Sequence, residues 1–254
     1  MFDCYIGIDY SGAQAPVSRL RGLKVFAAGR NDPVVQIFPR DRRAQNWCRK
    51  EVYQYCREKV LSGERCIISI DHGFSFPYSY FQRHCLAGWD AFLTHFHDIW
   101  STDRDHMYVD FIRQKNPPSG LSTELRLCEK WTAGAKSVFQ FGMQGSVAKS
   151  THSGIPWLIK LRDDKELAGV LHFWPFDGFN IPEGSSVIAE SYPSLFRRRY
   201  PRQGRTVDEQ DAFALGRWLK DMDSRGELLH YFNPPLTLPE RRMAQLEGWI
   251  LGVR

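Results

Sequence analysis

One short apolar run constrains the architecture of this chain more than any other feature of its sequence. Residues 65–71 read RCIISID, so a stretch of β-forming side chains ends on an aspartate. A run this apolar is typical of a central strand that is covered on both faces. In the preceding residues, 41–61, side chains such as Trp47, Val52 and Cys56 recur at three- and four-residue steps, which predicts a helix. A helix followed by a buried strand indicates an α/β protein.

Three further strands are predicted before that helix, over residues 3–9, 22–28 and 33–38. Three short strands in a row indicate an antiparallel meander. A helical crossover from the edge of the sheet back to its centre places the following strand beside the first one. Asp9 and Asp71 end these two strands, so we expect the two aspartates to be neighbours.

The middle of the chain, residues 76–185, is less regular and is predicted to be a largely helical insertion within a single domain that spans residues 1–254. Helices are expected at 88–100, at 104–114, at 121–134 and near 154–161. A stretch rich in glycine and serine, residues 141–154, is predicted to be a loop. Strands are expected at 169–174 and 186–190, and a last helix at 239–251.

Composition excludes several classes of protein. With 43% hydrophobic and 14% aromatic residues, the chain is too apolar to be disordered. No apolar run approaches the roughly 20 residues that span a bilayer, and the first residues lack the pattern of a signal peptide. The six cysteines are scattered without a C-x-x-C pair, so we expect a reduced cytoplasmic protein without a thiolate zinc site. The net charge of +5 permits a polyanionic partner but does not require one.

The clearest helix is predicted over residues 206–222, where Thr206 and Glu209 form a T-x-x-E capping box. Asp208 and Asp211 lie on the same face as the apolar stripe of this helix. Carboxylates on a buried face cost free energy unless they meet solvent or a cation. Mg²⁺ or Mn²⁺ would supply that cation, because hard ions prefer carboxylate oxygens.

Each of these aspartates also has a simpler interpretation. Acidic residues are favourable in the first turn of a helix because of the helix dipole, which would account for Asp208. Asp9 and Asp71 are followed closely by Ser-Gly and His-Gly, and could cap those turns. The joint arrangement favours a shared site, because strands and helices in this order would bring all four aspartates together.

Three short motifs resemble the acidic motifs of the ribonuclease H-like superfamily. They are I-G-I-D-Y-S-G at 6–12, I-I-S-I-D-H-G at 67–73 and V-D-E-Q-D-A at 207–212. The spacing of Asp208 and Asp211 on a late helix is most similar to the Holliday-junction-resolvase-like branch. The stretches at 137–147 and 189–198 are similar to an uncharacterised bacterial family of predicted ribonuclease H-like nucleases. The resemblance implies a mixed five-stranded sheet flanked by helices, and a nuclease activity.

The resemblance also implies a two-metal mechanism with Mg²⁺ or Mn²⁺. Asp9 would bridge both ions and Asp71 would bind one, while Asp208 and Asp211 would complete the ligand shell. One ion would activate a water and the other would stabilise the leaving oxygen of a phosphodiester. Glu190, at the end of its strand, is a fifth catalytic candidate that would bind metal or orient water. The alternative is that Glu190 is a surface acid.

Five arginines lie between Glu190 and Asp208, namely Arg197, Arg198, Arg199, Arg202 and Arg205. The segment that carries them is expected to lie beside the acidic site. Because the guanidinium group suits bidentate contacts with phosphate, these arginines are candidates for binding the backbone of a nucleic acid. The alternative is a solvated charged loop.

Two other functional classes stay open. The motif at 6–12 also resembles the phosphate motif of actin-like and sugar-kinase-like ATPases, which share the core fold but normally use two such domains. A catalytically silent nucleic-acid-binding module would keep the fold without activity. The sequence leaves open whether the nucleic acid is DNA or RNA.

Overall fold

A central sheet organises the computed structural model of this protein, which describes residues 1–117, 119–142 and 146–254. In these residues the sheet has six strands in the order β3-β2-β1-β4-β6-β5. The strands are β1 (Cys4–Asp9), β2 (Lys24–Gly29), β3 (Val35–Ile37), β4 (Cys66–Ile70), β5 (Leu171–Trp174) and β6 (Ser186–Glu190). The predicted α/β class is confirmed. The sheet has one strand more than the resemblance implied, because β5 joins its edge.

The pairing of the strands aligns three of their carboxyl ends. β1, β2 and β3 form an antiparallel meander, whereas β1, β4, β6 and β5 run parallel to one another. Ile8 is in register with Ile70, and Ile70 is in register with Glu190. The residues that follow β1, β4 and β6 therefore meet at the carboxyl ends of these parallel strands.

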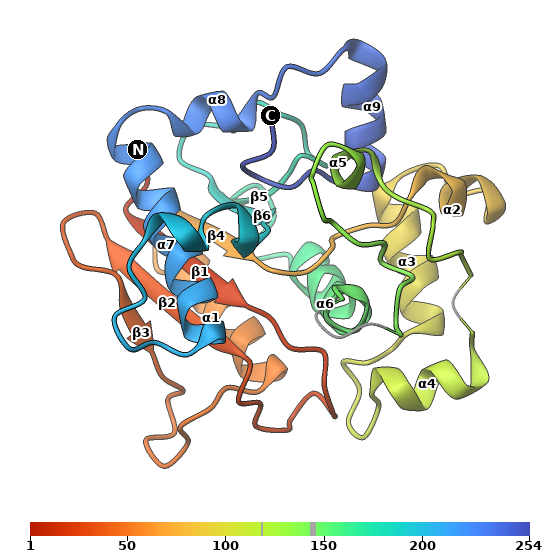
Figure 1. The fold of residues 1–254 in the computed structure, drawn as a ribbon, viewed down its shortest axis with the longest axis horizontal. Helices are drawn as coiled ribbons and strands as arrows, with labels where there is room; N and C mark the ends of the chain where they lie inside the picture. The colour runs from red at the N-terminus through yellow and green to blue at the C-terminus, as the bar shows by residue number, and fades with distance from the viewer. Residues whose placement is uncertain (118, 143–145) are drawn as a thin grey trace.

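Helices cover both faces of the sheet (Figure 1), because alternate strand residues point to opposite sides. On one face, Ile6 of β1 belongs to a core that includes α1 (Arg49–Leu61), α3 (Trp89–Ile99) and α6 (Ala148–Arg162). On the other face, Tyr5 belongs to a core with α7 (Val207–Ser224). Every residue of β1 and β4 is buried, as the apolar run at 65–71 predicted for β4.

Gly7 allows α7 to lie directly on β1. A Cβ atom on Gly7 would lie 2.3 Å from the carbonyl oxygen of Ala212 and 2.4 Å from the amide nitrogen of Gly216. Any larger residue would push the helix away from the strand. Figure 1 shows α7 crossing β1 and β2, with its first turns towards the edge where β1 ends.

In the described part of the chain, five helices lie between β4 and β5, and Figure 1 shows them on one side of the molecule. Besides α3 and α6 they are α2 (Tyr78–Arg83), α4 (Val109–Lys115) and α5 (Leu127–Lys130). Helices thus dominate the predicted insertion, but its last part contains β5 and returns to the sheet. After α7 follow α8 (Leu228–Phe232) and α9 (Leu238–Glu247). No helix in the described residues is long and apolar enough to cross a membrane.

Several predicted boundaries are wrong. α1 begins at Arg49, eight residues after its predicted start, and α9 ends at Glu247 rather than at residue 251. α6 begins at Ala148, within the predicted loop 141–154. Packing explains the small residues of α6, since a Cβ on Gly154 would lie 2.4 Å from Nε2 of His72. Residues 143–145, which belong to the predicted loop and to the stretch 137–147, lie outside the described residues.

Candidate functional site

Two aspartates form the centre of the candidate site. Asp9 is the last residue of β1 and is 9% exposed, and Asp71 directly follows β4. The backbone N–H of Asp71 donates a hydrogen bond of 3.0 Å to the carbonyl of Ile8, which continues the pairing of the two strands. The carboxyl groups of Asp9 and Asp71 lie close enough for each to change the pKa of the other.

α7 brings two more aspartates to the same place. Its first turn is fixed by the predicted capping box, in which the N–H of Glu209 donates to Thr206 Oγ1 at 3.2 Å and the N–H of Thr206 donates to Glu209 Oε2 at 2.9 Å. Asp208 faces the chain between β1 and β2, where its Oδ2 lies 3.4 Å from the place of a Cβ on Gly22. Asp211, one turn later, is 9% exposed. The helix thus presents both carboxylates towards the end of β1.

The four aspartates lie close enough to affect one another electrostatically. The pKa of Asp9 is raised well above its ordinary value by burial and then by the negative charges of Asp71, Asp208 and Asp211. Burial and the charges of Asp211 and Glu190 raise the pKa of Asp71 to about 8. Burial also raises the pKa of Asp211, against the opposing effect of Arg197. Without a cation, the site therefore opposes full ionisation.

The donor set fits a hard divalent cation. Asp211 Oδ2 accepts a hydrogen bond from Arg197 Nη1 at 3.2 Å, but its Oδ1 is buried and has no hydrogen-bond partner in the described part of the chain. A buried carboxylate oxygen without a donor is costly, and a metal ion would satisfy it. In the described residues, no three of these carboxylates have donor atoms that all lie within 4.8 Å of one another. In this geometry a single Mg²⁺ ion would therefore be bound directly by at most two of them, with waters as its other ligands.

Glu190 lies at the same edge but is neither a surface acid nor a free ligand. It is 4% exposed and forms a bidentate ion pair with Arg126, at 2.7 Å from Nη1 to Oε2 and 2.5 Å from Nη2 to Oε1. The N–H of Phe74 donates to the same carboxylate at 3.0 Å. Arg126, 1% exposed, also pairs with Glu129 at 2.8 Å. Glu190 therefore belongs to a buried ion-pair network. It affects Asp71 only through its negative charge, which raises the pKa of that aspartate.

The five arginines have different surroundings. Arg197 contacts Asp211, and together with Arg198 and Arg202 it lines a pocket of about 260 Å³ that reaches Asp211. The exposed Arg199 lies over the ring of Phe196, 5.6 Å from its centroid.

Arg205 has a structural role. It lies 3.6 Å over the ring of Phe213, and its Nε donates to Gln210 Oε1 at 2.9 Å. Three of the five arginines are thus placed to meet a ligand at Asp211.

The loops after β1 and β4 are held by residues that sequence reasoning missed. Arg49, completely buried, donates from Nη1 to the carbonyl of Ala13 at 2.6 Å and from Nη2 to that of Gln14 at 2.7 Å. Thr151 of α6 accepts a hydrogen bond from the N–H of Gly73 at 2.9 Å. A single arginine and a single threonine carry no sequence pattern that would reveal these contacts.

No protein-family model, no curated protein and no solved structure matches this chain. The function is therefore inferred from the residues of the site and their geometry.

Proposed function

We propose that this protein is a metal-dependent phosphodiesterase that cleaves nucleic acid, built on a ribonuclease H-like fold. The observation that carries the proposal is the convergence of Asp9, Asp71, Asp208 and Asp211 on one edge of the sheet. Burial and mutual repulsion raise the pKa of three of them. Such a site becomes favourable when a cation replaces the missing positive charge.

The topology supports the fold assignment. An antiparallel meander of β1, β2 and β3 is followed by a helix and by β4, which lies parallel to β1. The resemblance of the motifs implies such a core, with one aspartate at the end of the first strand and another after the fourth. The edge strand β5 is an addition to this core.

The four aspartates would hold Mg²⁺ or Mn²⁺, which supplies a nucleophilic water and stabilises the leaving oxygen of the phosphodiester. Asp9 is affected by the charges of Asp71, Asp208 and Asp211, which makes it the natural candidate for a shared ligand. Arg197, beside Asp211, is placed to contact a phosphate oxygen. Arg198 and Arg202, on the same pocket, would bind adjacent phosphates.

The test is a cleavage assay on labelled single-stranded, double-stranded and branched DNA and RNA with Mg²⁺ or Mn²⁺. We expect metal-dependent cleavage of at least one substrate, and its loss in Asp9→Asn and Asp71→Asn. Asp163→Asn is the matched control, because Asp163 is exposed at the far end of α6. Metal binding without cleavage of any substrate would favour a silent module, and hydrolysis of ATP would favour the ATPase class.

A further inference from the structure

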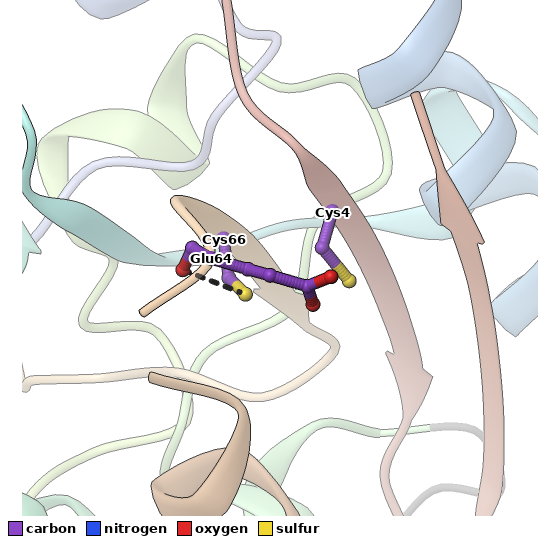
Figure 2. A group of neighbouring side chains, drawn as sticks. All are labelled: Cys4, Glu64 and Cys66. Carbon is purple, nitrogen blue, oxygen red and sulfur yellow. Dashed lines mark hydrogen bonds between the residues drawn. The ribbon is translucent and has the colours of Figure 1, made fainter. Parts of the chain in front are cut away.

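Two cysteines and a glutamate meet at the amino ends of β1 and β4, at the opposite ends of these strands from the aspartates. Cys4 begins β1 and Cys66 begins β4, and the two are paired in the parallel register. Glu64 lies two residues before β4. One ligand atom from each of the three lies within 4.8 Å of the other two. Figure 2 shows the carboxylate of Glu64 directed towards the sulfur of Cys4, and the sulfur of Cys66 hydrogen-bonded to the backbone carbonyl of Glu64.

The cluster combines buried sulfur with access from solvent. Cys4 is 4% exposed and Cys66 is completely buried, whereas Glu64 is exposed. The thiol of Cys66 donates to the backbone carbonyls of Lys59 at 3.5 Å and of Glu64 at 3.4 Å, and the neighbouring Cys66 lowers the pKa of Cys4. Lys59 Nζ lies 3.4 Å from Glu64 Oε2 at the solvent side. An ion could therefore reach the sulfur atoms past Glu64, if the half-exposed lysine turns outwards.

We propose that Cys4, Cys66 and Glu64 bind a thiolate-preferring divalent cation of the Zn²⁺ class. Two thiolates and one carboxylate provide three ligands, and a water from the solvent side would provide the fourth. Both cysteines bind as thiolates, so each ion bound releases the two thiol protons to solvent. The aspartate site has only oxygen donors and suits Mg²⁺ or Mn²⁺, so the two sites select different ions.

The spacing of the cysteines along the sequence did not predict this site. Without a C-x-x-C pair, no thiolate zinc site was expected, yet strand pairing joins two cysteines that are 62 positions apart. A metal there would connect the start of β1 to the start of β4. Because the ion would bind the folded chain and not the unfolded chain, it would raise the free energy of unfolding.

The test is a titration of the reduced, chelator-treated full chain with Cd²⁺, followed through the ultraviolet thiolate-to-metal charge-transfer band, and then competition with Zn²⁺. We expect one equivalent to bind, and the band to disappear in Cys4→Ser and Cys66→Ser. Glu64→Gln keeps both sulfur atoms and should weaken binding on the order of tenfold. Cys85→Ser, which removes an exposed cysteine, is the matched control and should retain the band.

Two further measurements keep the result decisive. Asp9→Asn should retain the Cd²⁺ band, which separates this site from the aspartate site. X-ray absorption on the Zn²⁺-loaded wild type should show two sulfur ligands, even if a cysteine variant does not fold. The absence of a thiolate band at saturating Cd²⁺, its persistence in a folded Cys4→Ser variant, or a Zn²⁺ shell without sulfur would overturn the proposal.

Discussion

The carboxyl groups of Asp9 and Asp71 lie beside each other at the ends of two adjacent parallel strands, and each changes the pKa of the other. The backbone forces this contact, because Ile8 and Ile70 are in register and the N–H of Asp71 donates to the carbonyl of Ile8. Two carboxylates so close repel each other when both are ionised. In the absence of a cation, the fold therefore bears an electrostatic cost that a ligand can remove.

Removing one of these charges should stabilise the metal-free protein. We expect Asp9→Asn to raise the free energy of unfolding at neutral pH by roughly 1–2 kcal/mol, as replacement of strained functional residues commonly does. The same variant should lose metal-dependent stabilisation. Urea unfolding with and without Mn²⁺ measures both effects. A variant that is less stable than the wild type without metal would contradict the repulsion argument.

Stability should depend on pH in a defined direction. The folded state holds the Asp71 proton up to a pKa of about 8, whereas the ordinary value is 3.8. Between these values the folded state binds more protons than the unfolded state, so the stability of the metal-free chain falls as pH rises through this window. Urea midpoints measured in metal-free buffer across the window check this. Asp71→Asn should make the dependence shallower, and an equally steep slope in both proteins would contradict the assignment.

Arg197 should contribute to nucleic-acid binding. Its side chain is 40% exposed and already contacts Asp211. We expect Arg197→Ala to weaken binding of a short oligonucleotide and to reduce the slope of log affinity against log salt by about 1. Arg225→Ala, an exposed arginine at the other end of α7, is the matched control and should leave the slope unchanged. Equal slopes in the wild type and Arg197→Ala would refute this contact.

Glu190 should matter for folding rather than for metal affinity. In Glu190→Gln the buried Arg126 loses one of its two charged partners and keeps Glu129. Breaking a buried ion pair costs about 3–5 kcal/mol. Thermal and urea unfolding measure the loss of stability. The folded fraction should still bind Mn²⁺ with wild-type affinity. A stable variant with strongly weakened Mn²⁺ binding would instead make Glu190 a ligand.

The sequence was most informative where a local pattern and a chemical requirement coincided. The run at 65–71 identified a strand buried on both faces, and the capping box at Thr206 fixed the start of α7 to within one residue. The positions of Asp208 and Asp211 on that helix followed from its period.

What the sequence did not reveal depends on contacts between distant segments. α6 contains Gly154 because His72 packs against it, so its small residues were mistaken for a loop. Glu190 was predicted to be a catalytic residue or else a surface acid, because its partner Arg126, 64 positions away, gives no local signal. The meeting of Cys4 with Cys66 appears only when β1 pairs with β4.

The most direct test of the central claim is a crystal structure with Mn²⁺, in which anomalous scattering locates the ions. The account predicts one or two Mn²⁺ ions bound by oxygens of Asp9, Asp71, Asp208 and Asp211. Crystals soaked at saturating Mn²⁺ that show no anomalous peak among these four carboxylates would contradict it.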